Sequence, residues 1–124
     1  MERIAARLQA DGLERGQAVA ILGTTTVNYA LVYLAAIRAG GCAAPLTTSA
    51  SREQLEGMAR DSGAQHLFID AAKQAELGAD FLPELTHIPL EDLRSWMAPA
   101  GAQVPGFVPD PKDHFNIIYS SGTT

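Results

Sequence analysis

Two hydrophobic periods alternate along the chain, and this alternation limits the folds open to it more than any other feature. Residues 18–22 form a continuous apolar run that ends at Gly23, which is typical of a strand buried on both faces. Residues 27–39 are apolar at nearly every position and stop at Gly40, so they predict a helix that is packed on most sides. A second short strand is predicted at residues 42–46. Strands that alternate with helices indicate βαβ crossovers and a mostly parallel sheet.

The alternation continues through the rest of the chain. Ser51 and Gln54 have the spacing of a capping box, in which each side chain bonds the other residue's backbone amide. They predict the start of a helix whose buried stripe includes Leu55 and whose stop is Gly63. Residues 97–111 are rich in proline and predict an irregular connection. The other predicted elements are a short helical stripe at residues 4–8, a strand at 66–70, a weak helix at 71–77, an edge strand at 86–90 and a last strand at 114–119. Together these elements predict an α/β fold, with helices on both faces of the sheet.

Composition excludes several classes of function. The 124 residues carry a net charge of −5, which argues against a nucleic-acid partner because surfaces that bind nucleic acid are basic. Cys42 is the one cysteine, so an internal disulfide is impossible, and we expect a small buried residue there. The most apolar segment, residues 29–37, is shorter than the ~20 residues that span a bilayer, so no transmembrane segment is expected. The charged start of the chain does not resemble a secretory signal, and we expect a cytoplasmic protein.

Most of the polar residues indicate structure and not chemistry. The three histidines have no metal-ligand spacing among themselves, so we expect no metal site and no catalytic residue in this segment. No serine is framed as a nucleophile elbow. Trp96 and Met97 are expected to anchor the irregular connection on the sheet. The acidic residues expected to form a solvated surface are Asp61, Asp70, Asp80, Glu84, Glu91 and Asp92.

The strongest local pattern is the predicted strand at 114–119 followed by a run of small residues. Ligands of α/β proteins collect at the carboxyl ends of strands. A loop of glycine and hydroxyl residues at that point can turn several backbone N–H groups toward one anion, and its glycine allows close approach. Ordinary turns have the same composition, and the run is not a complete P-loop. The candidate phosphate-binding residues are Ser120, Ser121, Gly122, Thr123 and Thr124.

Residues 119–124 (YSSGTT) resemble the opening of the signature loop of the adenylate-forming (AMP-binding) superfamily, which includes acyl-CoA ligases, luciferases and peptide-synthetase adenylation domains. Three upstream segments resemble the same superfamily in the right order: residues 12–22, residues 29–41, and the step from Pro45 to residues 53–55. The resemblance covers almost the whole chain. The sequence departs from the family pattern at Gln17, where Asp is usual, and at Thr24 and Thr47, where Asn is frequent.

The resemblance implies that residues 1–124 are part of a larger N-terminal AMP-binding domain, truncated at both ends. The complete enzyme would activate a carboxylate, with a fatty acid favoured, by attack on ATP to form an acyl-adenylate. It would then transfer the acyl group to CoA. ATP, Mg²⁺ and CoA are the implied cofactors, and residues 120–124 would hold the ATP phosphates. The remaining catalytic groups of the family lie beyond Thr124, so the segment alone is expected to be inactive.

Two other hypotheses remain open from the residues. The chain could be a free-standing α/β module that binds a nucleotide or a partner without turnover. It could also be an inactive remnant whose apolar helix, residues 27–39, causes association.

Overall fold

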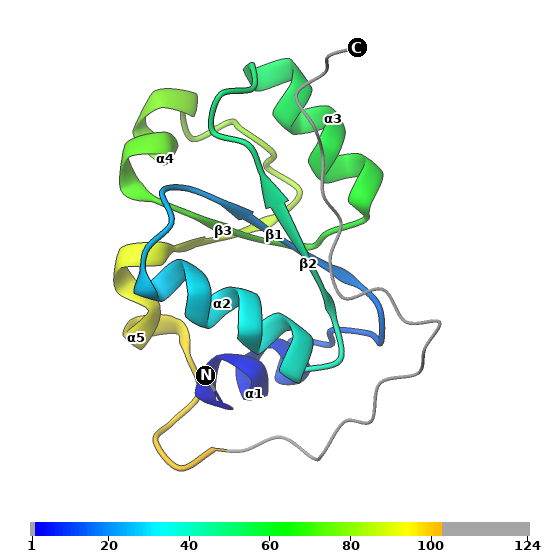
Figure 1. Ribbon diagram of the computed structural model, residues 1–124, viewed down its shortest axis with the longest axis vertical. Helices are drawn as coiled ribbons and strands as arrows, with labels where there is room; N and C mark the ends of the chain where they lie inside the picture. The colour runs from blue at the N-terminus through cyan, green and yellow to red at the C-terminus, as the bar shows by residue number, and fades with distance from the viewer. Residues whose placement is uncertain (1, 103–124) are drawn as a thin grey trace.

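The computed structural model describes residues 2–102, which form a parallel sheet covered by helices on both faces (Figure 1). The sheet contains four strands in the order β2-β1-β3-β4, and every neighbouring pair is parallel. The α/β prediction is therefore confirmed. The elements are α1 (Glu2–Ala10), β1 (Ala18–Leu22), α2 (Val27–Arg38), β2 (Cys42–Leu46), α3 (Arg52–Ser62), β3 (His66–Ile69), α4 (Ala71–Leu77), β4 (Thr86–Pro89), the 3-10 helix η1 (Leu90–Asp92) and α5 (Leu93–Trp96).

Two apolar cores lie on opposite faces of the sheet, because successive strand side chains point to opposite sides. One core joins the sheet to α1, α2 and α5, and Val19, Ile21 and Phe68 belong to it. The other joins the sheet to α3 and α4, and Leu22 and Leu67 belong to it. All five residues of β1 are buried, as its continuous apolar run predicts.

The helix ends follow the capping residues of the sequence. Ser51 and Gln54 form the complete capping box, and Gly63 ends α3 in the left-handed conformation with φ 75°. The Thr26 side chain accepts the backbone N–H of Tyr29 and begins α2. Asp70 was expected on a solvated surface at the end of a strand; in the structure its side chain begins α4 by accepting the N–H of Lys73.

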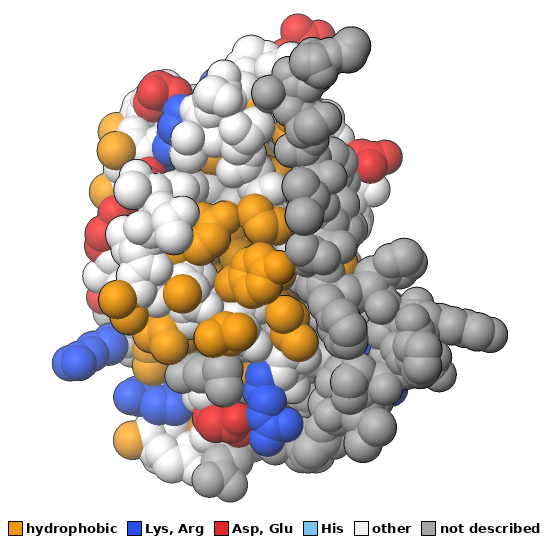
Figure 2. All heavy atoms as spheres, in the orientation of Figure 1, with side chains coloured by type: hydrophobic (Ala, Val, Ile, Leu, Met, Phe, Trp, Pro, Cys, Tyr) orange, Lys and Arg blue, Asp and Glu red, His pale blue; other side chains and the backbone are white. Residues whose placement is uncertain are grey.

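Two features of the helices differ from the sequence predictions. The chain after β4 forms η1 and α5, where no helix was expected. Helix α5 has only four residues, which is too short for a periodic pattern to predict it. Helix α2 was expected to be packed on most sides, but Val27 is 76% exposed and Leu34 is 50% exposed. Figure 2 shows apolar side chains gathered on this face of the molecule, over α2.

The backbone nitrogen of Pro45 lies on the side of β2 that faces away from β1. The Cys42 N–H donates to Gln17 O at 2.9 Å, so that amide points toward β1. Backbone groups alternate in direction along a strand, which turns the amide of Ala43 and the ring of Pro45 to the opposite side. The missing N–H of proline therefore falls where it interrupts no bond to β1.

Candidate functional site

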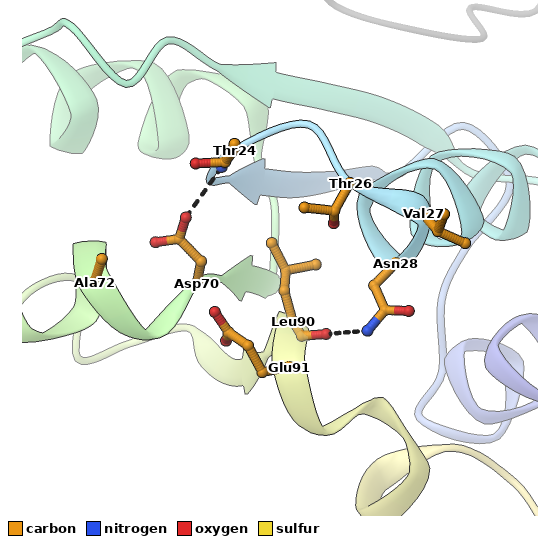
Figure 3. A pocket seen from close by; sticks show the side chains of 8 residues that line it. All are labelled: Thr24, Thr26, Val27, Asn28, Asp70, Ala72, Leu90 and Glu91. Atoms are coloured by element: carbon orange, nitrogen blue, oxygen red, sulfur yellow. Dashed lines mark hydrogen bonds between the residues drawn. The ribbon is translucent and has the colours of Figure 1, made fainter.

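The carboxyl edge of the sheet has a topological switch point. From β1 the chain crosses to β2 on one side, whereas from β3 it crosses to β4 on the other. The connections therefore diverge between the ends of β1 and β3, and this is where ligands of open α/β sheets bind. A cavity of about 450 Å³ opens there (Figure 3). It is lined by Thr24, Thr26, Val27, Asn28, Asp70, Ala72, Leu90 and Glu91.

Asp70 joins the two strands that flank the switch point. Its Oδ2 accepts the backbone N–H of Thr24 at 3.0 Å (Figure 3). Its Oδ1 accepts the N–H of Lys73 at 2.8 Å. Gly23 permits this arrangement, because a Cβ at that position would lie 2.9 Å from Asp70 Oδ2 and 3.0 Å from Leu90 Cδ1. The geometry of the edge thus depends on a glycine and a carboxylate that are far apart in the sequence.

Two further bonds fix the segment after β4. The Asn28 side chain donates to Leu90 O at 2.7 Å, which holds η1 against the start of α2 (Figure 3). The carboxylate of Glu91 accepts the Ala71 N–H at 3.0 and 3.1 Å, at the start of α4. Asn28, Asp70 and Glu91 therefore bring α2, α4 and η1 together around the cavity.

The electrostatics of this cavity do not favour a polyphosphate on the described residues alone. Asp70 and Glu91 both place carboxylates at its lining. Lys73 lies next to it, but its ammonium group already contacts Thr48 O at 2.8 Å and Glu76 Oε2 at 3.0 Å. Phosphate oxygens need donors or cations, so an ATP site at this edge requires groups from outside residues 2–102.

The predicted phosphate-binding residues, Ser120, Ser121, Gly122, Thr123 and Thr124, lie outside the described residues. The predicted strand at 114–119 and most of the predicted connection at 97–111 lie there as well. Within residues 2–102, no group of three or more His, Cys, Asp or Glu residues could hold a metal ion.

Other sequence predictions can be placed. Cys42 is buried, and burial raises the pKa of its thiol, which disfavours the reactive thiolate. His66 is 5% exposed and its Nε2 lies 3.0 Å from Asp11 Oδ2. Both ring nitrogens of His87 have hydrogen-bond partners, Gln74 Oε1 at 2.8 Å and Leu82 O at 2.9 Å. Within the described part of the chain, both histidines therefore have structural roles.

Sequence reasoning missed the roles of Asn28, Asp70 and Glu91 at the carboxyl edge. Asp70 had one local indication, since an Asp directly before a helical segment is a favoured N-cap. Its bond to Thr24 spans 46 residues and the bond from Asn28 to Leu90 spans 62, so neither has a local sequence pattern.

Comparison with known proteins identifies the family. The sequence profile of the family described as AMP-binding enzyme matches residues 1–124, the entire chain. The chain belongs to the AMP-binding enzyme family. This match confirms the resemblance to the adenylate-forming superfamily that the signature-loop opening and the upstream segments indicated.

The relatives of this AMP-binding chain differ in their named substrates. It is 30% identical over 124 residues to an L-proline–[L-prolyl-carrier protein] ligase of Pseudomonas fluorescens. The match covers 96% of this chain and 25% of that protein. It is 38% identical over 68 residues to an oxalate–CoA ligase of Arabidopsis thaliana, which covers 54% of this chain and 13% of that protein. The chain thus spans about a quarter or less of the length of these relatives.

Solved structures share the fold. O-succinylbenzoate Coenzyme A synthetase from Bacillus subtilis, in complex with AMP, superposes with a TM-score of 0.80 at 22% identity, covering 99% of this chain and 31% of that one. The N-terminal domain of FACL13 from Mycobacterium tuberculosis gives 0.78 at 25% identity, covering 97% and 32%. In the described part of the AMP-binding chain, no helix is long and apolar enough to cross a membrane.

Proposed function

We propose that the complete protein is an AMP-forming acid–CoA ligase. It activates a carboxylate with ATP to an acyl-adenylate and pyrophosphate, and then transfers the acyl group to the thiol of CoA. The observation that carries the proposal is the family match, because it extends through residues 120–124, where the sequence matches the opening of the signature loop. The relatives named as CoA ligases support the same activity.

In this proposal residues 120–124 hold the β- and γ-phosphates of ATP. Backbone amides and the hydroxyls of Ser120, Ser121, Thr123 and Thr124 donate to phosphate oxygens, and Gly122 allows close approach. Fixed donors of this kind stabilise the charge that develops on the leaving pyrophosphate. Asp70 and Glu91 are the carboxylates at the cavity, and residues 2–102 contain no group of three or more His, Cys, Asp or Glu residues that could hold a metal ion. The Mg²⁺ that accompanies ATP would be held by groups outside residues 2–102.

The acid and the acceptor are the open parts of the proposal. We propose a fatty acid as substrate, a preference that follows from the family alone. A second candidate is an amino acid loaded onto a carrier protein, which the 30% identity to the proline–carrier protein ligase favours. The two candidates share the adenylation step and differ in the acid and in the thiol that receives it.

The test is ATP–pyrophosphate exchange by the full-length polypeptide against a panel of fatty acids, short dicarboxylates and amino acids. Exchange that depends on one acid supports adenylation, and thioester formation with CoA or a carrier protein then assigns the acceptor. Binding of ATP without exchange for any acid would favour the nucleotide-binding module. Exchange with amino acids alone would overturn the fatty-acid preference.

A pair of variants tests the proposed loop in the same assay. Thr123→Val removes a hydroxyl donor, and exchange is expected to fall by about tenfold or more because the donor acts on developing charge. Ser95→Ala is the control: Ser95 lies on α5, where its hydroxyl donates to Asp92, and exchange should not change. Equal rates for both variants would contradict phosphate binding by residues 120–124.

The organisation of the protein is part of the proposal. Residues 1–124 form part of a larger N-terminal domain, and the 124-residue segment alone should give no exchange. Intact mass under denaturing conditions measures the length of the natural polypeptide, and cell fractionation tests the proposed cytoplasmic location. Exchange by the isolated segment would show that the signature-loop opening is sufficient for adenylation.

A further inference from the structure

Two buried nitrogen atoms at the amino edge of the sheet lack hydrogen-bond partners. They are Nδ1 of His66, at the start of β3, and Nε1 of Trp96, at the end of α5. Among the described residues no other buried side-chain polar atom is unpartnered. A buried polar atom without a partner destabilises the fold, so two of them on side chains that contact each other require an explanation.

The two atoms lie on rings that contact each other. The imidazole of His66 and the indole of Trp96 pack edge to face, with centroids 6.1 Å apart and planes at 70°. Trp96 is held in place by two other contacts. Its ring meets Phe68 at 5.2 Å, and its carbonyl accepts the Arg7 guanidinium at 2.6 Å. The indole therefore cannot leave the imidazole without giving up these contacts.

The chemistry of the two nitrogens can be complementary. An indole nitrogen only donates, whereas each imidazole nitrogen donates or accepts according to the tautomer. His66 Nε2 lies 3.0 Å from the Asp11 carboxylate, which only accepts when ionised. The proton of a neutral ring therefore belongs on Nε2, and Nδ1 presents a lone pair. A protonated ring would instead place a second N–H donor beside the indole N–H and leave both unsatisfied.

The charged groups around the imidazole are consistent with this tautomer. Asp11, in the turn after α1, faces Nε2. Arg7, on α1, bonds Asp11 Oδ1 at 2.9 Å and also lies 5.0 Å from the centroid of the Trp96 ring. The α5 residue whose ring contacts the imidazole, Trp96, carries no charge. Arg7 thus satisfies the second oxygen of the carboxylate that orients His66.

We propose that Arg7, Asp11, His66 and Trp96 form a hydrogen-bonded relay in which His66 is fixed as the Nε2–H tautomer and one buried water joins its Nδ1 to the indole N–H of Trp96. The two nitrogens are not within hydrogen-bond distance of each other, so the indole N–H donates to the water and the water donates to Nδ1. The relay joins α1 and its following turn, β3 and α5, and Trp96 acts as a positioning residue for the chain that leaves α5. Asp11 controls the tautomer through its bond to His66 Nε2.

The test uses nitrogen-15 NMR of the full chain at pH 7. Trp96 is the one tryptophan among residues 1–124, and the indole signal that disappears in Trp96→Phe identifies it in the full-length polypeptide. Long-range proton–nitrogen correlation of the His66 ring is expected to show a protonated Nε2 and an unprotonated Nδ1. A proton on Nδ1, or on both nitrogens, would overturn the proposal without any variant having to fold.

Hydrogen exchange of the indole N–H measures the bond itself. His66→Phe keeps an aromatic ring but removes the acceptor, and the exchange rate is expected to rise by about fivefold, the worth of one net hydrogen bond. Asp11→Ala should also raise the rate, because the tautomer is no longer fixed. Glu84→Ala is the matched control, a carboxylate paired with Arg60, and should leave the rate unchanged.

The outcomes separate the relay from simple packing. An unchanged exchange rate in both His66→Phe and Asp11→Ala would show that the indole proton is protected by burial alone, and would overturn the proposal. A nuclear Overhauser contact between the indole proton and water, lost in His66→Phe, would support the bridging water. The absence of that contact in the unmodified protein would overturn the proposal.

Discussion

The two edges of the sheet use an aspartate in different ways. At the carboxyl edge, Asp70 accepts two backbone amides, those of Thr24 and Lys73. At the amino edge, Asp11 accepts from two side chains, Arg7 and His66. Asp70 lines a cavity. At the amino edge, the nitrogens His66 Nδ1 and Trp96 Nε1 are buried. The carboxyl edge is thus held by bonds to the main chain around an open space, and the amino edge by bonds between side chains.

This difference teaches what each edge can contribute to function. Backbone donors keep their positions when side chains change, so Asp70 fixes the ends of β1 and β3 while the crevice between them stays free. The side-chain cluster at the amino edge positions the elements that it joins. The following predictions test that division, from the largest expected effect to the smallest.

Gly23→Ala should disturb the carboxyl edge most. The new Cβ would lie 2.9 Å from Asp70 Oδ2, and that oxygen is held by Thr24 N, so either the bond breaks or Leu90 shifts as well. We expect a loss of about 2 kcal/mol in the free energy of unfolding. Gly57→Ala is the matched control, since a Cβ at this α3 position meets nothing within 4 Å. It should gain about 0.5–1 kcal/mol. Urea denaturation measures both, and equal stability of the two variants would refute the close approach.

Asp70→Ala should lower the stability by about 1–2 kcal/mol, because it removes both the N-cap of α4 and the bond to Thr24. Asp70→Asn keeps one acceptor oxygen and should cost less. Thermal unfolding of the two variants gives the comparison. If Asn and Ala cost the same, the carboxylate does not act through two separate amides.

Asp11→Asn should change the pH dependence of stability at the amino edge. Partial burial raises the pKa of Asp11, but hydrogen bonds from Arg7 and His66 and the charge of Arg7 outweigh burial and lower the pKa below 3.8. A lowered folded pKa stabilises the protein above the unfolded value, and this is lost as pH falls through the folded value. We expect an advantage over the variant of about 0.5 kcal/mol at pH 7, because the pair is partly exposed. Urea midpoints from pH 7 to pH 2 should converge below 3.8, and a difference that persists there would contradict the linkage.

The smallest effect is expected on the outer face of α2, away from both edges. Leu34 is 50% exposed, so Leu34→Gln should change the free energy of unfolding by less than about 0.5 kcal/mol. Ala36→Gln is the contrast, since Ala36 is fully buried and a larger polar side chain there should be strongly destabilising. A large loss in Leu34→Gln would mean that this face makes a contact in solution.

Much of the framework could be predicted because its causes are local. The apolar run at 18–22 indicates a strand covered on both faces, and both cores confirm it. The capping box at Ser51 specifies the start of α3, and Gly63 its end. These elements depend on periodicity and on single residues with strong conformational preferences.

The site could be predicted only in part, because its contacts join residues that are distant in the sequence. The bond between His66 and Asp11 spans 55 residues, and that between Asp70 and Thr24 spans 46. Neither bond follows from a periodic pattern, so the sequence alone predicted only a structural or surface role for His66 and Asp70. The expected place of Trp96 on the sheet is confirmed by its contact with Phe68, but the helix that carries it was too short to predict. Phosphate binding by residues 120–124 stays a prediction.

Pro45 limits how any further strand can pair with β2. Amides alternate in direction along a strand, so the positions of β2 that face away from β1 are Ala43 and Pro45. Only Ala43 has an amide to donate there, and Ala43 is fully buried. A strand added on this side would receive a donor from Ala43 and none from Pro45, which makes β2 a poor template for a continuous ladder.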